Sequence, residues 1–139
     1  MKRASPWPGH FAVAQAALPF IRKDGSITFI SAVSAHAAMP GTAGIGAANA
    51  AVAMFVPILA AELRPLRVNG VSPGVVDTPW WDFLTSEQRE AVFADYAGKT
   101  PVGRVGKPDD IAQAVAFLVS NSFMSGHVIV CDGGLRLAA

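Results

Sequence analysis

The stretch that decides the fold is Arg67-Val68-Asn69-Gly70-Val71-Ser72-Pro73-Gly74-Val75-Val76-Asp77-Thr78. Its first five residues, Arg67 to Val71, predict a short strand that contains the β-branched Val68 and Val71. Ser72 to Gly74 predicts a turn, since proline fixes φ and glycine adopts conformations that other residues avoid. The loop that we expect next, Val75 to Phe83, is rich in aromatic residues, namely Trp80, Trp81 and Phe83.

Helical and extended patterns alternate on both sides of this stretch. We predict helices over Phe11–Ile21, Ala43–Leu63 and Pro108–Ser120, and strands over Ser26–Ser31 and His127–Cys131. Loops are expected over Ala32–Thr42 and Pro101–Lys107. A short helix begins at Thr85-Ser86-Glu87, with Ser86 as its expected cap. Strands separated by helical crossovers are typical of a parallel sheet, so the fold class is α/β.

The composition points to one folded domain with little polar surface. The 139 residues are 52% hydrophobic and 15% charged, which excludes a disordered chain. Such an apolar domain either hides surface against a partner chain or is the interior of a larger α/β protein, and both interpretations stay open. The net charge is +1 and no basic stripe occurs, so we expect no nucleic-acid partner.

The sequence gives no reason to expect a signal peptide or a membrane span. The single cysteine, Cys131, has no partner for an internal disulfide, which favours a reducing compartment. The basic start Met1–Pro6 is not followed by a long apolar run, so we expect no signal peptide. The apolar stretch Ala47–Ala61 contains Asn49 and Pro57 and is too short to span a bilayer. We therefore expect a soluble, cytoplasmic protein that does not enter a membrane.

Three segments together resemble the short-chain dehydrogenase/reductase family. They are Gly25–Ser31, Arg67–Thr78, and Gly103–Ala112 with the closing Asp132-Gly133-Gly134. The match runs from about Gly9 to Gly134 and resembles only the second half of the family's fold. The resemblance implies a single domain over residues 1–139, a partial Rossmann-like doubly wound parallel sheet of about three core strands with flanking helices.

The resemblance also implies NAD or NADP as cofactor, but the glycine-rich turn that holds its pyrophosphate belongs to the first half of that fold. Gly41-Thr42-Ala43-Gly44-Ile45-Gly46 only imitates that turn, being one residue short and lying about ten residues beyond its strand. Without the glycine-rich turn, we do not expect tight cofactor binding.

The family's catalytic residues are a tyrosine, a lysine four residues later, and a serine about thirteen residues before the tyrosine. Matching Pro40-Gly41 and Ala50-Ala51-Val52 to the helix entry places these roles at Ile45, Asn49 and Ala32. An asparagine that many members contribute would fall near Pro6. A phenol needs a nearby cation to act as a base at neutral pH, and no phenol or lysine occupies these positions. We therefore expect no hydride transfer.

Nearby polar residues leave a different chemistry open. Ser34 and His36 are weak catalytic candidates in the loop after the strand, and strand alternation points Ser31 away from the face of Ala32. One alternative is a different reaction in the cleft, carried out by Ser34, His36, Asn49 or Asp77. The simpler interpretation is that these residues are solvated loop residues without a catalytic role. His10 and His127 lack metal-ligand spacing, so we expect no metal site, and Cys131 is typical of a small buried residue.

Two further groups match functional segments of the family. Pro73, Gly74, Val76 and Thr78 match the segment that faces the nicotinamide carboxamide, although they also suit a simple turn after a strand. Trp80, Trp81 and Phe83 match the mobile substrate loop, where aromatic side chains line a pocket, cover a sheet edge or meet a partner.

The resemblance finally implies partners. In the family, the helix that matches Ala43–Leu63 and the last strand pack across a subunit interface, which predicts a homo-oligomer. The first strand leaves an uncovered edge, where a partner chain could pair. We thus expect a protein that descends from NAD(P)-dependent oxidoreductases and is a truncated pseudoenzyme. The alternative is a non-catalytic interaction or oligomerisation subunit.

Overall fold

The computed structural model describes residues 6–138, with side chains from Gly9 onward. Its α-helices are α1 (Pro6–Ala17), α2 (Ala43–Glu62), α3 (Ser86–Lys99), α4 (Pro108–Ser120) and α5 (Leu135–Ala138), and its strands are β1 (Ser26–Ile30), β2 (Arg67–Pro73) and β3 (Val128–Cys131). Short 3₁₀ turns cover Leu18–Phe20, Val33–Ala35 and Pro79–Trp81.

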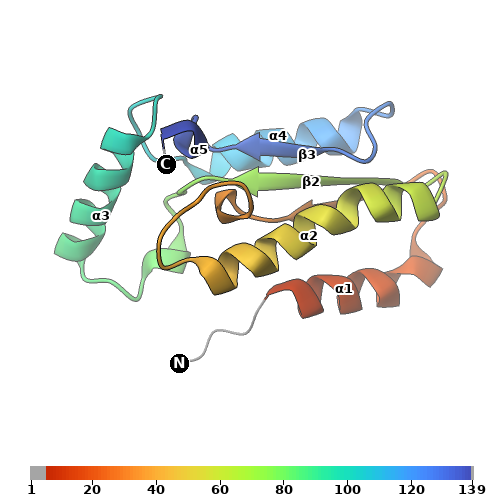
Figure 1. Ribbon diagram of the computed structural model, residues 1–139. Coiled ribbons are helices and arrows are strands. Elements are labelled where there is room, and N and C mark those ends of the chain that lie inside the picture. The colour runs from red at the N-terminus through yellow and green to blue at the C-terminus, as the bar shows by residue number, and fades with distance from the viewer. Residues whose placement is uncertain (1–5, 139) are drawn as a thin grey trace.

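The three strands form one parallel sheet in the order β1-β2-β3. Ile27 lies beside Val68, and Gly70 lies beside Val128, so the expected neighbouring parallel segments are confirmed. Helices α1 and α2 lie on one face of the sheet and α4 lies on the other, while α3 stands apart from it (Figure 1). This is the α/β, Rossmann-like layering that the sequence predicts.

The core lies between α2 and the sheet. Phe29 of β1 and Val68 of β2 are buried against Val52 and Val56 of α2. Gly70 permits this approach, because a Cβ there would lie 3.1 Å from Cγ2 of Val56. The helix therefore presses close to β2 through small and β-branched side chains.

Polar side chains of β2 fasten the opposite face to the end of α4. The guanidinium of Arg67 donates to the carbonyl oxygens of Leu118 at 2.8 Å and Val119 at 2.9 Å. Asn69 donates to the carbonyl oxygen of Met124 at 2.8 Å and accepts from the backbone N–H of His127. Arg67 thus satisfies carbonyls that the C-terminus of α4 leaves without intrahelical partners, and Asn69 holds the loop that follows this helix.

Several element boundaries differ from the expected ones. Ser72 and Pro73 continue β2 instead of forming a turn, because they pair with Val130 and Cys131 of β3. Helix α1 begins at Pro6 and ends at Ala17, ahead of the 3₁₀ turn Leu18–Phe20 that contains a proline.

The cap of α3 also differs from the expected one. Thr85, not Ser86, is the N-cap: its hydroxyl accepts from the backbone N–H of Gln88, while the Gln88 side chain accepts from the backbone N–H of Thr85. This reciprocal pair is a capping box, which a sequence reveals through the residue three positions later.

Helix α2 extends beyond the apolar stretch Ala47–Ala61 at both ends. Helix α2 has 20 residues and a mean hydropathy of 1.8, so by length and composition alone it could cross a bilayer. Its buried residues Val52 and Val56 pack on the sheet.

Candidate functional site

The three positions matched to the family's catalytic residues gather around the start of α2. Ala32 directly precedes the 3₁₀ turn Val33–Ala35 and is extended, with φ −154° and ψ 161°. Ile45 lies in the first turn of α2 and is 41% exposed, whereas Asn49, one turn later, is only 5% exposed. The structure therefore presents Ile45 outward and buries Asn49.

Asn49 is the centre of a small hydrogen-bonded network. Its side-chain amide Nδ2 donates to Oγ of Ser34 at 3.0 Å, and its backbone carbonyl accepts from the buried hydroxyl of Ser31 at 2.9 Å. Gly46 lets the chains approach, because a Cβ there would lie 2.8 Å from the carbonyl oxygen of Ser34. The segment after β1 is thus fastened to α2 by neutral groups.

Of the four residues proposed for an alternative chemistry, the structure brings together only Ser34 and Asn49. His36 is exposed, and its imidazole makes no hydrogen bond among the residues described. Asp77 faces Arg89 instead. Ser34 therefore has an amide donor beside it and no visible base, which is poor geometry for a nucleophile.

The segment Pro73–Thr78 is built into the fold by its own contacts. Gly74 abuts the chain of Asp132, since a Cβ on Gly74 would lie 2.8 Å from Cα of Asp132. Val76 forms a parallel bridge with Gly106, and its carbonyl accepts from the indole Nε1 of Trp81 at 2.9 Å. These contacts hold the segment that follows β2 in place.

Arg89 holds the aromatic loop to α3, and sequence reasoning missed this residue. Its guanidinium pairs with the carboxylates of Asp77 and Asp82 and lies 5.4 Å from the ring centre of Phe93. Trp81 in turn meets Phe93 edge to face. No local motif marks the pairing, because Arg89 lies twelve residues beyond Asp77.

The aspartate of Asp132-Gly133-Gly134 caps the last helix. Its carboxylate accepts from the backbone N–H groups of Gly134 and Arg136, each at 2.9 Å. Burial by itself would raise the pKa of Asp132, but these hydrogen bonds and the charge of Arg136 leave that pKa below its ordinary value. The group is therefore a charged structural anchor at the end of the sheet.

Cys131 lies partly buried next to this anchor. Burial, followed by the nearby charges of Asp110 and Asp132, raises the pKa of its thiol, so the thiol form dominates at neutral pH. Within residues 6–138, no three histidine, cysteine or acidic side chains lie close enough together to hold a metal ion.

The parallel α/β sheet is the fold that the resemblance to short-chain dehydrogenases/reductases predicts. Comparison with known proteins gives the same family. The family model described as enoyl-(acyl carrier protein) reductase matches residues 7–136. The chain belongs to the short-chain dehydrogenase/reductase family.

Among curated relatives, a 3-oxoacyl-[acyl-carrier-protein] reductase of Thermotoga maritima is 37% identical over 133 residues, which cover 91% of this chain and 52% of the relative. Carbonyl reductase family member 4 of Xenopus laevis is also 37% identical, covering 84% of this chain and 47% of the relative. The chain spans about half the length of the curated relatives it matches.

Solved structures show the same relation. A small-chain dehydrogenase in complex with NADPH superimposes with a TM-score of 0.91 at 35% identity, covering 94% of this chain and 60% of that one. A short-chain dehydrogenase/reductase from Brucella melitensis gives a TM-score of 0.82 at 36% identity, covering 92% and 52%.

Proposed function

We propose that this chain is an oxidoreductase-family protein that does not transfer hydride by the family's tyrosine–lysine route. The observation that carries the proposal is the pairing of Asn49 with Ser34 at the position matched to the lysine. A buried amide bears no charge, so it does not supply the cation that lowers the pKa of a neighbouring phenol in the family. The position matched to that phenol holds Ile45, which has no proton to give.

The cofactor positions support the same proposal. NADPH is bound by one structural neighbour, and NAD(P) is the family's cofactor. In this chain, Gly74 and Val76 are engaged with Asp132, Gly106 and Trp81. The neutral Asn49 offers no cation for a nicotinamide ribose. We propose that the residues described bind NAD(P)H weakly and do not use it for the family's reaction.

A reversion experiment tests the proposal. The triple variant Ala32→Ser, Ile45→Tyr, Asn49→Lys restores the family's residue types, and a β-ketoacyl thioester is a suitable substrate because relatives are 3-oxoacyl reductases. We expect NADPH oxidation by neither the wild-type chain nor the single variants, and more activity in the triple variant than in any single one. NADPH oxidation that depends on the wild-type chain would contradict the proposal.

A second candidate function is that of an oligomerisation subunit. The outer face of α2 exposes Met54 by 58% and Ile58 by 48%, and Val13 of α1 is also exposed. We propose that this face of α2, together with β3, forms a homo-oligomer interface, because exposed apolar surface is stabilised by association. Analytical ultracentrifugation should show a dimer or larger species of the wild-type chain, and Met54→Lys should dissociate it. A monomeric wild-type chain would exclude this second function.

We also propose a reducing, cytoplasmic location, on the basis of the lone Cys131. Cell fractionation tests this directly, because the protein should separate with soluble cytoplasmic markers. Recovery in the membrane fraction would instead favour the bilayer alternative for α2.

A further inference from the structure

The two ends of helix α3 are held to the rest of the chain in different ways. The helix stands apart from the sheet (Figure 1), and none of its residues is buried. Just after its C-terminal end, Thr100 is buried, and the N–H of Val102 donates to the carbonyl oxygen of Gly133 at 3.2 Å. The N-terminal half of α3 is attached through Arg89 instead.

Arg89 binds both ends of the loop that precedes α3. One guanidinium nitrogen donates to the carboxylate of Asp77 and, at 3.4 Å, to the carbonyl oxygen of Thr78, and the other donates to Asp82 at 3.2 Å. Among residues 6–138, every side-chain hydrogen bond from α3 to a residue before Thr85 comes from Arg89. A single cation thus joins this loop to the helix.

An aromatic cluster adjoins the same guanidinium. Arg89 lies 5.4 Å from the ring centre of Phe93, and Trp81 meets Phe93 edge to face with their ring centres 5.7 Å apart. The indole Nε1–H of Trp81 donates to the carbonyl oxygen of Val76 at 2.9 Å. Because these contacts connect the loop to α3 around Arg89, we expect the loop and the helix to open together.

The ion pairs of Arg89 reach solvent. Its side chain is 31% exposed, and those of Asp77 and Asp82 are 50% and 64% exposed. Salt screens such pairs, since the Debye length falls from about 10 Å at 0.1 M to about 3 Å at 1 M. A helix of 14 residues without tertiary contacts is marginally stable in water. Screening should therefore allow α3 to melt from its N-terminal end.

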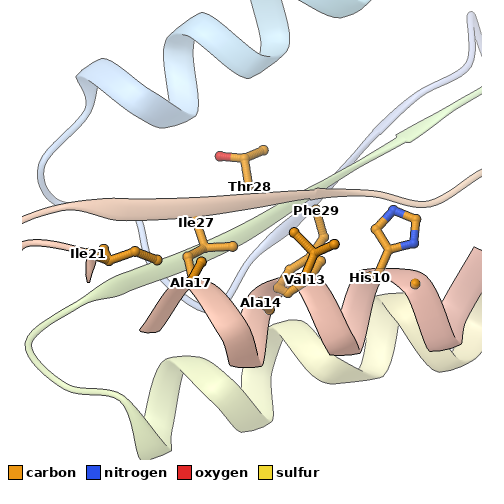
Figure 2. Close-up of a pocket in the computed structure, with 9 residues that line it drawn as sticks. His10, Val13, Ala14, Ala17, Ile21, Ile27, Thr28 and Phe29 are labelled. Carbon is orange, nitrogen blue, oxygen red and sulfur yellow. The ribbon is translucent and has the colours of Figure 1, made fainter. Parts of the chain in front are cut away.

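Helix α1 is attached by apolar contacts and provides an internal comparison. Figure 2 shows Ala14 and Ala17 of α1 facing Ile27 and Phe29 of β1, and Ala14 packs against the core that contains Phe29. These contacts carry no charge for salt to screen. The two helices should therefore respond differently to ionic strength.

We propose that Arg89 is a positioning residue that acts as an ionic latch, closing residues 77–82 onto the N-terminal half of α3 at low ionic strength and releasing both together, with the sheet still folded, at high ionic strength. The physical cause is the screening of its pairs with Asp77 and Asp82. The proposal does not depend on whether Ile45 and Asn49 prevent hydride transfer, because neither position contacts the latch.

Hydrogen exchange measured by NMR tests the latch in the wild-type chain. The readouts are the protection factors of the Trp81 indole N–H and of the amides of residues 92–95, each corrected for intrinsic exchange at the same salt concentration. Raising NaCl from about 0.1 M to about 1 M should lower both about three- to tenfold. The amides of Ala14 in α1 and Gly70 in β2 should keep theirs. An equal response to salt in α1 and α3 would overturn the proposal.

Arg89→Met and Lys99→Met form a matched pair of variants. Arg89→Met keeps an apolar stem beside Phe93 and removes the cation, whereas Lys99→Met removes a cation whose pair with Asp95 is exposed. We expect Arg89→Met to lower the protection of the Trp81 indole at least about tenfold at low salt and to abolish its salt dependence. Lys99→Met should change that protection less than about twofold and keep the salt dependence.

Arg89→Lys should give an intermediate protection, because lysine keeps the charge and lacks the planar fork. Protection of Gly70 confirms that the sheet of each variant is folded. If Arg89→Met does not fold, the salt series of the wild-type chain still decides. A salt response that persists in Arg89→Met, or equal protection of the Trp81 indole in Arg89→Met and Lys99→Met, would overturn the proposal.

Discussion

The side-chain amide of Asn49 donates a hydrogen bond of 3.0 Å to the hydroxyl of Ser34. This bond joins α2 to the segment after β1 at the position where the family resemblance places a lysine. Because the amide of Asn49 is neutral and hydrogen-bonded, we expect this position to contribute to the stability of the folded chain.

We expect Asn49→Ala to lower the free energy of unfolding by about 1–3 kcal/mol, because truncation loses a buried hydrogen bond and leaves a void. Ser34→Ala should cost less, since Ser34 is only partly buried. In a double-mutant cycle followed by urea unfolding, the two changes should couple by about 1 kcal/mol. Additive effects would mean that the bond contributes nothing to the folded state.

Gly74 tests whether the turn after β2 is structural. A Cβ at Gly74 would lie 2.8 Å from Cα and 3.0 Å from Cβ of Asp132. Gly74→Ala should therefore destabilise the chain by about 1–3 kcal/mol. The control is Gly98→Ala in α3, where a Cβ meets nothing within 4 Å. That change should stabilise the helix by about 0.5–1 kcal/mol, and equal urea midpoints for the two variants would refute the packing argument.

Arg67 joins β2 to the C-terminus of α4 through several carbonyl oxygens. Arg67→Met should lower the free energy of unfolding by about 2–3 kcal/mol, because charged donors to a helix end are lost. Arg67→Lys should give an intermediate loss, since lysine lacks the planar fork. Arg64→Met, at an exposed position just before β2, should lie within about 0.5 kcal/mol of wild type. A thermal or urea series that ranks these variants differently would contradict this role.

The carboxylate of Asp132 should make stability fall in acid. Its pKa is lowered in the folded state from an ordinary value of 3.8. The stabilisation is therefore present above pH 3.8 and is lost as the pH falls through the folded pKa.

Asp132→Asn should cost about 2 kcal/mol at neutral pH and distinctly less near pH 3. Asp95→Asn is the control, because Asp95 forms only an exposed pair with Lys99. A pH-independent cost for Asp132→Asn, measured by urea unfolding at both pH values, would show that its charge is not involved.

The sequence predicted those parts of the fold that depend on local pattern. Ile27, Val68 and Val128 lie in short β-branched runs, and their parallel neighbourhood was predicted correctly. Ser72 and Pro73 were misassigned, because their strand character comes from pairing with Val130 and Cys131, more than fifty residues away. Ser86 was a reasonable cap, and only the backbone decided between it and Thr85.

The same distinction applies to the candidate site. The motif spacing assigned the family's catalytic positions to Ala32, Ile45 and Asn49. It did not predict the bond from Asn49 to Ser34, which depends on how the turn after β1 meets α2. Arg89 was missed for a similar reason, since its pairing with Asp77 depends on the position of α3. Long-range polar pairs leave no local periodicity in a sequence.

The most direct test of the central claim is deuteride transfer by the wild-type chain. NADPH deuterated at C4 is incubated with a β-ketoacyl thioester, and the product is analysed by mass spectrometry. We predict no deuterium in the product above a protein-free control. Deuterium incorporation that depends on the wild-type chain would contradict the account of Ile45 and Asn49.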